Sequence, residues 1–576
     1  MSKQTKQTFL YGATILMASM IVVKLIGYIF KIPLSNILQE TGMSYFTAAY
    51  QLFNTVYALT VTGLSAAVAR MVAETTSKGR YRDARKILKI SNVIFFILGI
   101  LGMLITLFSA KGISSFLKIP NSYWSIVMLS PALFFCCAMA SYRGYYEGLS
   151  NMIPTAITQI VEVVVKLIAG LGFSALIIAI GKQQYLQNGT AFGMVIDNEE
   201  NLMSALLPYA SAGAVLGVTI STLIGFIYIF IRYKMKGDYI TKQQLMESPK
   251  AMNTNVLFLR LVKISIPVTL GAVVIQLSAF IDSITISNRL AYAYSKDPEY
   301  FLNLYGHLIT DDTPMNVFLY GCFGVVISIF NLVPAFTNIF GKSALPNVTA
   351  AWTTKNKEKI KTNIESVIRV TMLIAAPIGF GIIALSDGIL KLLYPNLQGV
   401  LTVGPALLST LGFGAILLSL VTPMNAIMQG IGKVDLPVKF MFVGAILKLV
   451  LNIILIGIPK INLIGSSIST FVCYGVILAL YINTLRKNIR INLNYTGIFL
   501  KPAICGLFCG ISAFFSNKAL TFMKKDSIIT LLSIMVGALV YMVSLIALNA
   551  IAEDDVLMLP KGNKILKLFK KFRIIR

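Results

Sequence analysis

The sequence predicts an all-α integral membrane protein with about fourteen transmembrane helices. Of its 576 residues, 56% are apolar and 13% are charged, which is about half the charged share of a typical soluble domain. Apolar segments of about 20 residues, the length that crosses a bilayer as a helix, recur along the whole chain. Because these segments use most of the sequence, little remains for a soluble domain.

The predicted spans are separated by polar links, and their ends are predicted to within a few residues. They cover residues 9–34, 45–72, 90–110, 123–142, 155–181, 208–231, 260–286, 316–340, 366–386, 401–424, 437–458, 462–484, 498–517 and 527–549. The first span follows Lys3 and Lys6 and continues to about Leu34 without a small-residue cleavage site. We therefore interpret it as a retained span and not as a signal peptide.

Basic residues are distributed unequally between the two sides of the predicted membrane. With the N-terminus inside, the links and adjoining helix ends on that side hold 35 of the 50 Lys and Arg residues, and the opposite links hold ten. This asymmetry follows the positive-inside rule, so we expect a multi-pass protein of the cell membrane with both termini in the cytoplasm. The same asymmetry accounts for the net charge of +27 without a nucleic-acid partner.

An internal repeat predicts two pseudo-symmetric lobes. Lys166 follows Gly148 at the same spacing at which Lys448 follows Gly430, with a proline shortly after each glycine. Shorter matches pair residues 73–76 with 351–354 and 131–133 with 405–407. The predicted units are an N-lobe of helices 1–6 at 1–250, a C-lobe of helices 7–12 at 251–490, helices 13 and 14 at 491–552, and a basic amphipathic cytoplasmic tail at 553–576. Lobes related in this way usually enclose a substrate site and rock around it.

Two links on the predicted outer side are long and acidic. They cover residues 182–207 and 287–315, and we interpret both as solvated loops. The basic tail should instead lie on the inner membrane surface, where each basic side chain near anionic lipid contributes about 1 kcal/mol. Anionic membrane lipids are therefore expected partners of the tail.

Ionisable residues inside the spans are the candidate site residues, because a charge in the hydrocarbon region is costly. They are the cations Lys24, Lys31, Arg70, Lys166 and Lys448 and the anions Glu162 and Asp282. Lys24 lies about 22 Å into its span, and Lys166 and Lys448 each lie about 17 Å past a helix-opening proline, near the midplane. Lys31 and Arg70 lie nearer helix ends, where snorkelling is an equally good explanation. The excess of cations favours an anionic substrate.

The spacing of these residues suggests how the charges pair. Glu162 precedes Lys166 by four residues, which favours an ion pair along one helix. The repeat position of Glu162 is Gly444, so we expect Lys448 to be the freer cation. Asp282 lies seven residues before Arg289. A structural pair at the membrane surface is the simpler explanation for Asp282, which is also our candidate for ion coupling.

No catalytic or cofactor motif is evident in the sequence. The six cysteines lie in apolar stretches, and the single histidine, His307, lies in a polar link. We therefore expect buried thiols, no metal site, no cofactor and no catalytic triad. No paired carboxylates occur at one depth, so we do not expect an enzyme.

Several stretches carry a resemblance to a known family. They are Ser141-Tyr142-Arg143-Gly144-Tyr145-Tyr146-Glu147-Gly148, Pro154-Thr155-Ala156, Gln159-Ile160-Val161-Glu162, Ile281-Asp282-Ser283, Asn288-Arg289-Leu290, Leu319-Tyr320-Gly321 and Met428-Gln429-Gly430-Ile431-Gly432-Lys433. With them the chain resembles the MOP flippase superfamily. Within it, the chain is similar to the stage V sporulation protein B-like and MurJ-type lipid II flippase branch of polysaccharide biosynthesis proteins.

The resemblance implies a two-lobed, fourteen-helix fold that moves a lipid-linked, pyrophosphate-bearing oligosaccharide from the inner to the outer leaflet. It implicates Lys24, Lys31 and Arg289 in substrate binding. Members of the MurJ type commonly have arginine where this chain has lysine in the first span, and a basic residue near the position of Tyr57. Lysine binds phosphate without the bidentate hydrogen bonds that arginine forms, so these departures affect which substrate is expected.

The leading hypothesis is a flippase for the lipid-linked peptidoglycan precursor, lipid II. Lys24, Lys31 and Lys448 would attract its pyrophosphate, with Arg70, Glu162, Lys166 and Arg289 completing the candidate binding set. The alternatives are an exporter of another lipid-linked polysaccharide, a cation-coupled drug antiporter, and a non-transporting scaffold for cell-wall or spore-cortex synthesis proteins. The sequence leaves the exact substrate, the coupling ion and the oligomeric state open.

Overall fold

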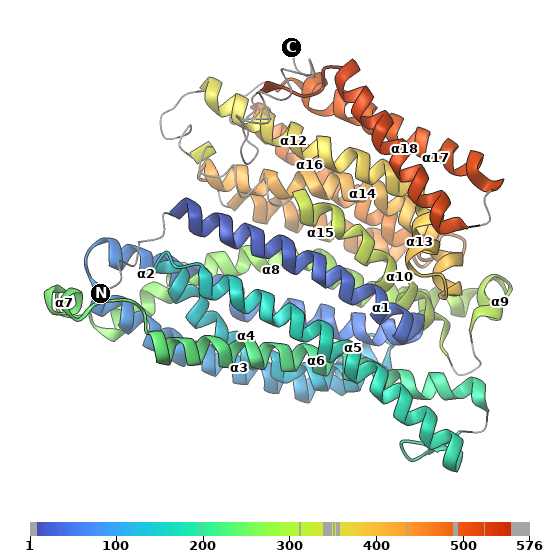
Figure 1. Cartoon of the computed structure of the whole chain (residues 1–576), viewed down its shortest axis with the longest axis horizontal. Coiled ribbons are helices and arrows are strands. Elements are labelled where there is room, and N and C mark those ends of the chain that lie inside the picture. The colour runs from blue at the N-terminus through green and yellow to red at the C-terminus, as the bar shows by residue number, and fades with distance from the viewer. Residues whose placement is uncertain are drawn as a thin grey trace. The chain divides into compact units, whose positions relative to one another are not determined.

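The computed structural model describes residues 9–196, 198–309, 313–337, 348–349, 352, 357–433, 435–487, 493–522 and 525–553. Within these residues, thirteen helical segments are long and apolar enough to cross a membrane (Figure 1). The predicted all-α, multi-pass membrane fold is therefore confirmed. The amphipathic tail predicted at 553–576 lies, apart from its first residue, outside the described residues.

The first helical segment contains the first two predicted spans. It runs from Ala18 to Ser77, and its 60 residues would extend about 90 Å if straight, about three times the hydrocarbon thickness. At Gln39 the backbone leaves the helical region (φ 54°, ψ −172°). The rings of Phe30 and Phe46 on either side lie 6.3 Å apart, although a straight helix would separate the two residues by about 24 Å. The chain therefore folds back at Gln39, and thirteen segments accommodate fourteen spans.

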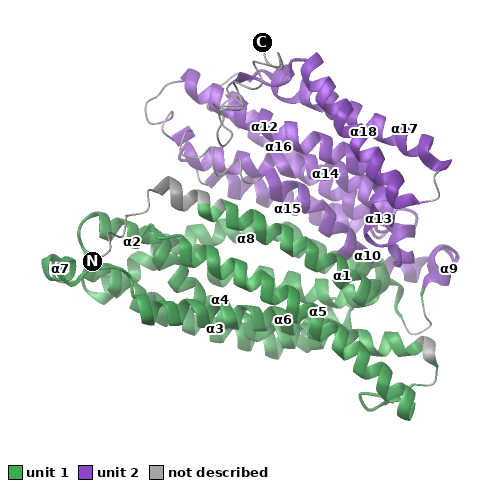
Figure 2. Ribbon diagram, viewed as in Figure 1, with its two compact units in different colours: residues 1–291, 309–321 green, residues 292–308, 322–576 purple. Residues whose placement is uncertain are grey.

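The chain divides into two compact units (Figure 2), the first comprising residues 1–291 and 309–321. Its elements are α1 (Phe9–Tyr57), a π-helical turn (Ala58–Thr62), α2 (Gly63–Ser77), α3 (Tyr81–Phe116), a 3-10 turn (Pro120–Ser122), α4 (Tyr123–Gly148), α5 (Ile153–Asn188), β1 (Thr190–Ala191), β2 (Met194–Val195), α6 (Glu199–Lys236), α7 (Lys242–Glu247) and most of α8 (Thr254–Lys296). The long helices α3 to α6 run alongside one another (Figure 1).

Glycines allow the helices of the first unit to approach closely. A Cβ atom on Gly217 of α6 would lie 2.3 Å from the backbone nitrogen of Gly170 on α5, so no larger residue fits this crossing. Gly63 at the start of α2 would similarly meet Thr269 of α8 at 2.1 Å. Small residues at such crossings are what membrane helices need to pack, because lipid supplies no hydrophobic drive between them.

The predicted solvated loop at 182–207 is instead largely ordered secondary structure. Helix α5 continues to Asn188, β1 and β2 pair antiparallel with Thr190 opposite Val195, and α6 begins at Glu199. The loop prediction was wrong here because acidic residues mark exposure but do not prevent a helix. In the other long link, α8 runs to Lys296 and is followed by α9 (Pro298–Tyr305) and a 3-10 turn (Gly306–Leu308).

The basic stretch at the start of α3 holds the link between α6 and α8. Arg85 donates two hydrogen bonds to Asp238, at 2.6 and 2.9 Å, and the Tyr145 hydroxyl donates a third at 2.9 Å. Burial alone would raise the pKa of Asp238, but these hydrogen bonds and the charge of Arg85 lower it. Lys86 donates to the carbonyl of Met252 at 2.6 Å. The basic residues counted as topology signals therefore also have a structural role.

The second unit comprises residues 292–308 and 322–576 (Figure 2). Its described helices are α9, most of α10 (Met315–Phe330), α12 (Lys357–Ala384), α13 (Ser386–Leu393), α14 (Gln398–Gly430), α15 (Asp435–Leu455), α16 (Ile464–Lys487), a π-helical turn (Thr496–Leu500), α17 (Lys501–Ala519), a 3-10 turn (Leu520–Phe522) and α18 (Asp526–Ala547). Helix α14 packs against both α12 and α16, and α17 packs against α12 and α18.

The turns before α5 and α15 share one backbone conformation. Ser150 and Gly432 occupy equivalent positions in the repeat, and both have a left-handed backbone, with φ of 59° and 82°. The next residue in each turn, Asn151 or Lys433, donates its N–H to the carbonyl five residues earlier, at 2.9 Å in both. This match supports the internal repeat. The lobe boundaries at 250 and 490 stay a prediction. By compactness, most of α8 groups with the first unit.

Candidate functional site

Three of the predicted cations gather in the first unit. Lys24 and Lys31 lie seven residues apart on one face of α1, and Lys166 lies on α5, which packs against α1. The positive charges of Lys24 and Lys166 both act on Lys31. Lys24 is exposed, whereas Lys31 and Lys166 are half-buried. We call these three residues the lysine cluster.

Aromatic side chains surround the ammonium group of Lys166. Its Nζ donates to the hydroxyl of Tyr50 at 3.2 Å and lies 4.5 Å from the centroid of that ring and 4.9 Å from the centroid of Phe30. Tyr50 belongs to a row along α1 in which its ring stacks on Phe46 at 5.5 Å and on Phe53 at 6.0 Å. Ring faces stabilise a cation without neutralising it. The Lys166 ammonium group is therefore contacted by one hydroxyl and two ring faces.

Glu162 pairs with Arg143 of α4 and not with Lys166. Arg143 Nη2 lies 2.7 Å from Glu162 Oε2, and Arg143 Nε donates to Thr158 Oγ1 at 2.9 Å. The predicted pairing of Glu162 with Lys166 is thus wrong in this structure, because Arg143 reaches two acceptors on α5 while Lys166 extends toward α1. In the part of the chain that the structure describes, no carboxylate forms an ion pair with Lys166.

Lys448 is the more enclosed of the two repeat-related lysines. Its side chain on α15 is 2% exposed and has interaction partners. Neighbouring Gly444 brings α16 close, since a Cβ there would lie 2.4 Å from Ile477 Cδ1. The expectation that Lys448 would be the freer cation is therefore wrong: absence of a local carboxylate does not make a lysine accessible.

The remaining predicted site residues lie elsewhere in the first unit. Arg70 is exposed in the middle of α2, seven residues before the helix ends at Ser77. Asp282 is buried on α8 within electrostatic reach of Tyr320, and Arg289 is half-buried about 10 Å further along the same helix. Both have interaction partners. The Asp282–Arg289 pair and the ion-coupling role of Asp282 stay predictions.

Sequence reasoning missed three residues of the site: Arg143, Tyr50 and Thr158. Arg143 was excluded from the intramembrane charges because the fourth span was predicted to end at 142, whereas α4 continues to Gly148. Arg143 and Glu162 lie on different helices, so no periodic signal in the sequence indicates their contact. Tyr50 and Thr158 carry no charge, so only the packing of α5 against α1 and α4 reveals them.

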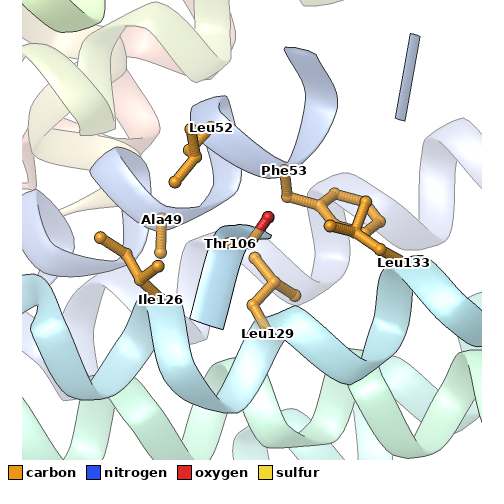
Figure 3. Close-up of a pocket in the computed structure, with 7 residues that line it drawn as sticks. All are labelled: Ala49, Leu52, Phe53, Thr106, Ile126, Leu129 and Leu133. Carbon is orange, nitrogen blue, oxygen red and sulfur yellow. The ribbon is translucent and has the colours of Figure 1, made fainter. Parts of the chain in front are cut away.

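A small pocket in the first unit is apolar and carries no charge (Figure 3). Its lining residues are Ala49, Leu52, Phe53, Thr106, Ile126, Leu129 and Leu133. The hydroxyl of Thr106 is the polar group among them. This pocket does not suit an anionic ligand, so the lysine cluster is the candidate site.

The described residues contain no group of three or more His, Cys, Asp or Glu side chains that could hold a metal ion. All six cysteines are buried, and none of them forms a disulfide. The groups present at the site are the ammonium groups of the lysine cluster, the Arg143–Glu162 pair, hydroxyls and aromatic rings.

Two families match the chain and together cover more than half of it. Residues 9–196 match the family described as polysaccharide biosynthesis protein, and residues 321–454 match the family described as MatE. The chain is 21% identical over 556 residues to stage V sporulation protein B of Bacillus subtilis, covering 96% of this chain and 98% of that protein. It is 25% identical over 475 residues to the lipid II flippase MurJ of Bacillus subtilis, covering 81% of this chain and 80% of that protein.

The fold has a counterpart among solved structures. A structure of lipid II flippase MurJ in an inward closed conformation aligns with a TM-score of 0.60 at 12% identity, covering 92% of this chain and 97% of that chain. At this identity the likeness shows a shared fold.

Proposed function

We propose that this chain, which belongs to the MOP superfamily of membrane transporters and flippases, moves a lipid-linked, pyrophosphate-bearing saccharide across the membrane. The substrate proposed first is lipid II, carried from the inner to the outer leaflet by alternating access. The N- and C-termini would lie in the cytoplasm, following the distribution of basic residues.

The lysine cluster is the observation that carries this proposal. A pyrophosphate brings several negative charges, and moving it through a bilayer requires cations at membrane depth. Lys24, Lys31 and Lys166 supply three, and Lys166 has no carboxylate ion-pair partner in the described part of the chain. A site for cationic drugs would need carboxylates in the same place, so the drug-antiporter alternative is disfavoured.

The three lysines differ in exposure, which suggests an order of contact. Exposed Lys24 would meet the pyrophosphate first, and half-buried Lys31 and Lys166 would then hold it. Lysine binds phosphate as a mobile point charge and not through a rigid fork, so the bound group can be passed on and released. Lys448 would contribute only in a conformation that exposes it.

Lipid II is favoured among lipid-linked saccharides because one relative, aligned over 81% of this chain, is a lipid II flippase. Stage V sporulation protein B, aligned over 96%, leaves a sporulation-related saccharide as the alternative. The lysine cluster recognises the pyrophosphate shared by both substrates, so it does not separate them.

The test is transbilayer movement of head-group-labelled lipid II in proteoliposomes containing the purified chain. Lys31→Ala should slow movement at least about tenfold, because the free energy of one lost charge-assisted contact corresponds to about that factor. Lys182→Met, which removes a cation from α5 outside the cluster, should move lipid II at the wild-type rate. Wild-type rates in Lys31→Ala would contradict the assignment of the site.

The same vesicles separate the candidate substrates. Movement of a different lipid-linked saccharide in place of lipid II would redirect the proposal to that substrate. Movement of neither, in protein shown to be folded, would contradict transport and favour a scaffold, for which the intramembrane lysines are dispensable.

A further inference from the structure

Helix α5 carries a carboxylate and an ammonium group one turn apart, yet the two are not paired. Glu162 and Lys166 have the spacing at which side chains on a helix meet most easily. If they paired, the lysine cluster would lose a third of its charge. What prevents the pairing therefore bears directly on the site.

Arg143 holds Glu162 through a fixed geometry. Its guanidinium reaches Glu162 Oε2 at 2.7 Å and Thr158 Oγ1 at 2.9 Å, one turn apart on α5. The Thr158 hydroxyl donates its own proton to the carbonyl of Thr155 at 2.8 Å, so its oxygen is oriented to accept from Arg143. With the side chains of Arg143 and Glu162 only 13% and 19% exposed, water competes little for the pair.

The second unit shows that helices of this kind fold without the ion pair. In the register that aligns Gly148 with Gly430, the repeat positions of Arg143, Thr158 and Glu162 are Asn425, Phe440 and Gly444. Asn425 accepts a hydrogen bond from Tyr481, whose ring also contacts Phe440. Both charges are absent there together, so packing of the two helices does not require them. The pair is specific to the unit that holds the lysine cluster.

We infer that Arg143 is a positioning residue: by binding Glu162 it keeps that carboxylate away from Lys166 and leaves the Lys166 ammonium group to an anionic ligand. The inference rests on the proposed function, because the ligand is taken to be a lipid pyrophosphate. Glu162, predicted as a binding residue, is here the partner of Arg143 and does not contact the substrate.

The test is binding of geranylgeranyl pyrophosphate to the purified full chain in detergent, with geranylgeraniol as the uncharged control. In Arg143→Gln, Glu162 is released to Lys166, so pyrophosphate affinity should fall about tenfold. In Arg143→Gln/Glu162→Gln the competing carboxylate is gone, so affinity should return to within about twofold of wild type. Arg143→Lys, which retains a cation for Glu162, should keep most of the affinity.

The outcomes separate the inference from the proposed function. A wild-type chain that binds the pyrophosphate no better than the alcohol contradicts the proposed function. A wild-type chain that prefers the pyrophosphate, with a double variant as weak as Arg143→Gln, contradicts the inference alone, since Arg143 would then act on the ligand or on the fold. Wild-type affinity in Arg143→Gln also contradicts it.

A double-mutant cycle between Lys166→Met and Glu162→Gln tests the inference even if Arg143→Gln does not fold. If Arg143 already removes Glu162 from Lys166, then Lys166→Met should weaken pyrophosphate binding by the same factor in the wild-type and Glu162→Gln backgrounds. A much larger loss in the Glu162→Gln background would show that Glu162 neutralises Lys166 and would overturn the inference.

Discussion

Helices α5 and α15 begin with the same turn, and each places a lysine at the same position, but the two lysines end in different surroundings. Lys166 is half-buried, bonded to the Tyr50 hydroxyl and bordered by aromatic rings. Lys448 is 2% exposed on a helix where Gly444 admits α16 closely. The position of a lysine along a helix follows from the local sequence. Its accessibility to a ligand depends on which side chains of the neighbouring helices pack around it.

The largest expected difference between the two helices is in anion binding. Lys166→Met should weaken binding of geranylgeranyl pyrophosphate at least about tenfold, because it removes a cation that forms no ion pair with a carboxylate of the described residues. Lys448→Met should leave that affinity within about twofold and lower thermal stability, because Lys448 is enclosed with its partners. Titration of both variants in detergent measures this, and equal losses of affinity would remove the distinction.

The close approach at Gly444 should be costly to disturb. Gly444→Ala places a methyl group 2.4 Å from Ile477 Cδ1 and 3.1 Å from Cys473 Sγ, so it should destabilise the protein by about 1–3 kcal/mol. Gly381→Ala on α12, where nothing lies within 4 Å, is the matched control and should be neutral or stabilising. Unfolding in detergent is the measurement. Part of the cost should disappear when Ile477→Val removes the contacting Cδ1, and stability equal to that of Gly381→Ala would contradict the packing argument.

The smallest expected effects concern the shared turn. Ser150 has a left-handed backbone that glycine adopts without strain, so Ser150→Gly should stabilise the first unit by about 1 kcal/mol. Gly432→Ser should cost the second unit a similar amount, since Gly432 has φ 82°. Thermal unfolding of both variants measures the two shifts. Shifts of the same sign would indicate that the two turns are not equivalent.

The features that the sequence predicts correctly are local ones. The spans, the repeated turn and the depth of Lys166 and Lys448 all follow from hydropathy and spacing within one segment. The break at Gln39 falls within the link predicted at 35–44, whereas the helical extension of α5 to Asn188 was not predicted, because it has no hydropathy signal.

The environment of the site depends on contacts between different helices. Tyr50 of α1 meets Lys166 of α5, and Arg143 of α4 meets Glu162 of α5. Spacing along α5 alone favours the wrong pair, Glu162 with Lys166. Only the packing of α4 and α1 against α5 shows that Glu162 pairs with Arg143 and that Lys166 contacts Tyr50.

The central claim is that the lysine cluster selects a lipid pyrophosphate by charge. The most direct measurement compares the affinity of the wild-type chain for geranylgeranyl pyrophosphate, geranylgeranyl monophosphate and geranylgeraniol with that of a variant carrying Lys24→Met, Lys31→Met and Lys166→Met. The account predicts that wild-type affinity falls in that order and that the triple variant binds all three alike. Equal affinity of the wild-type chain for the pyrophosphate and the alcohol, or an unchanged preference in the triple variant, would contradict it.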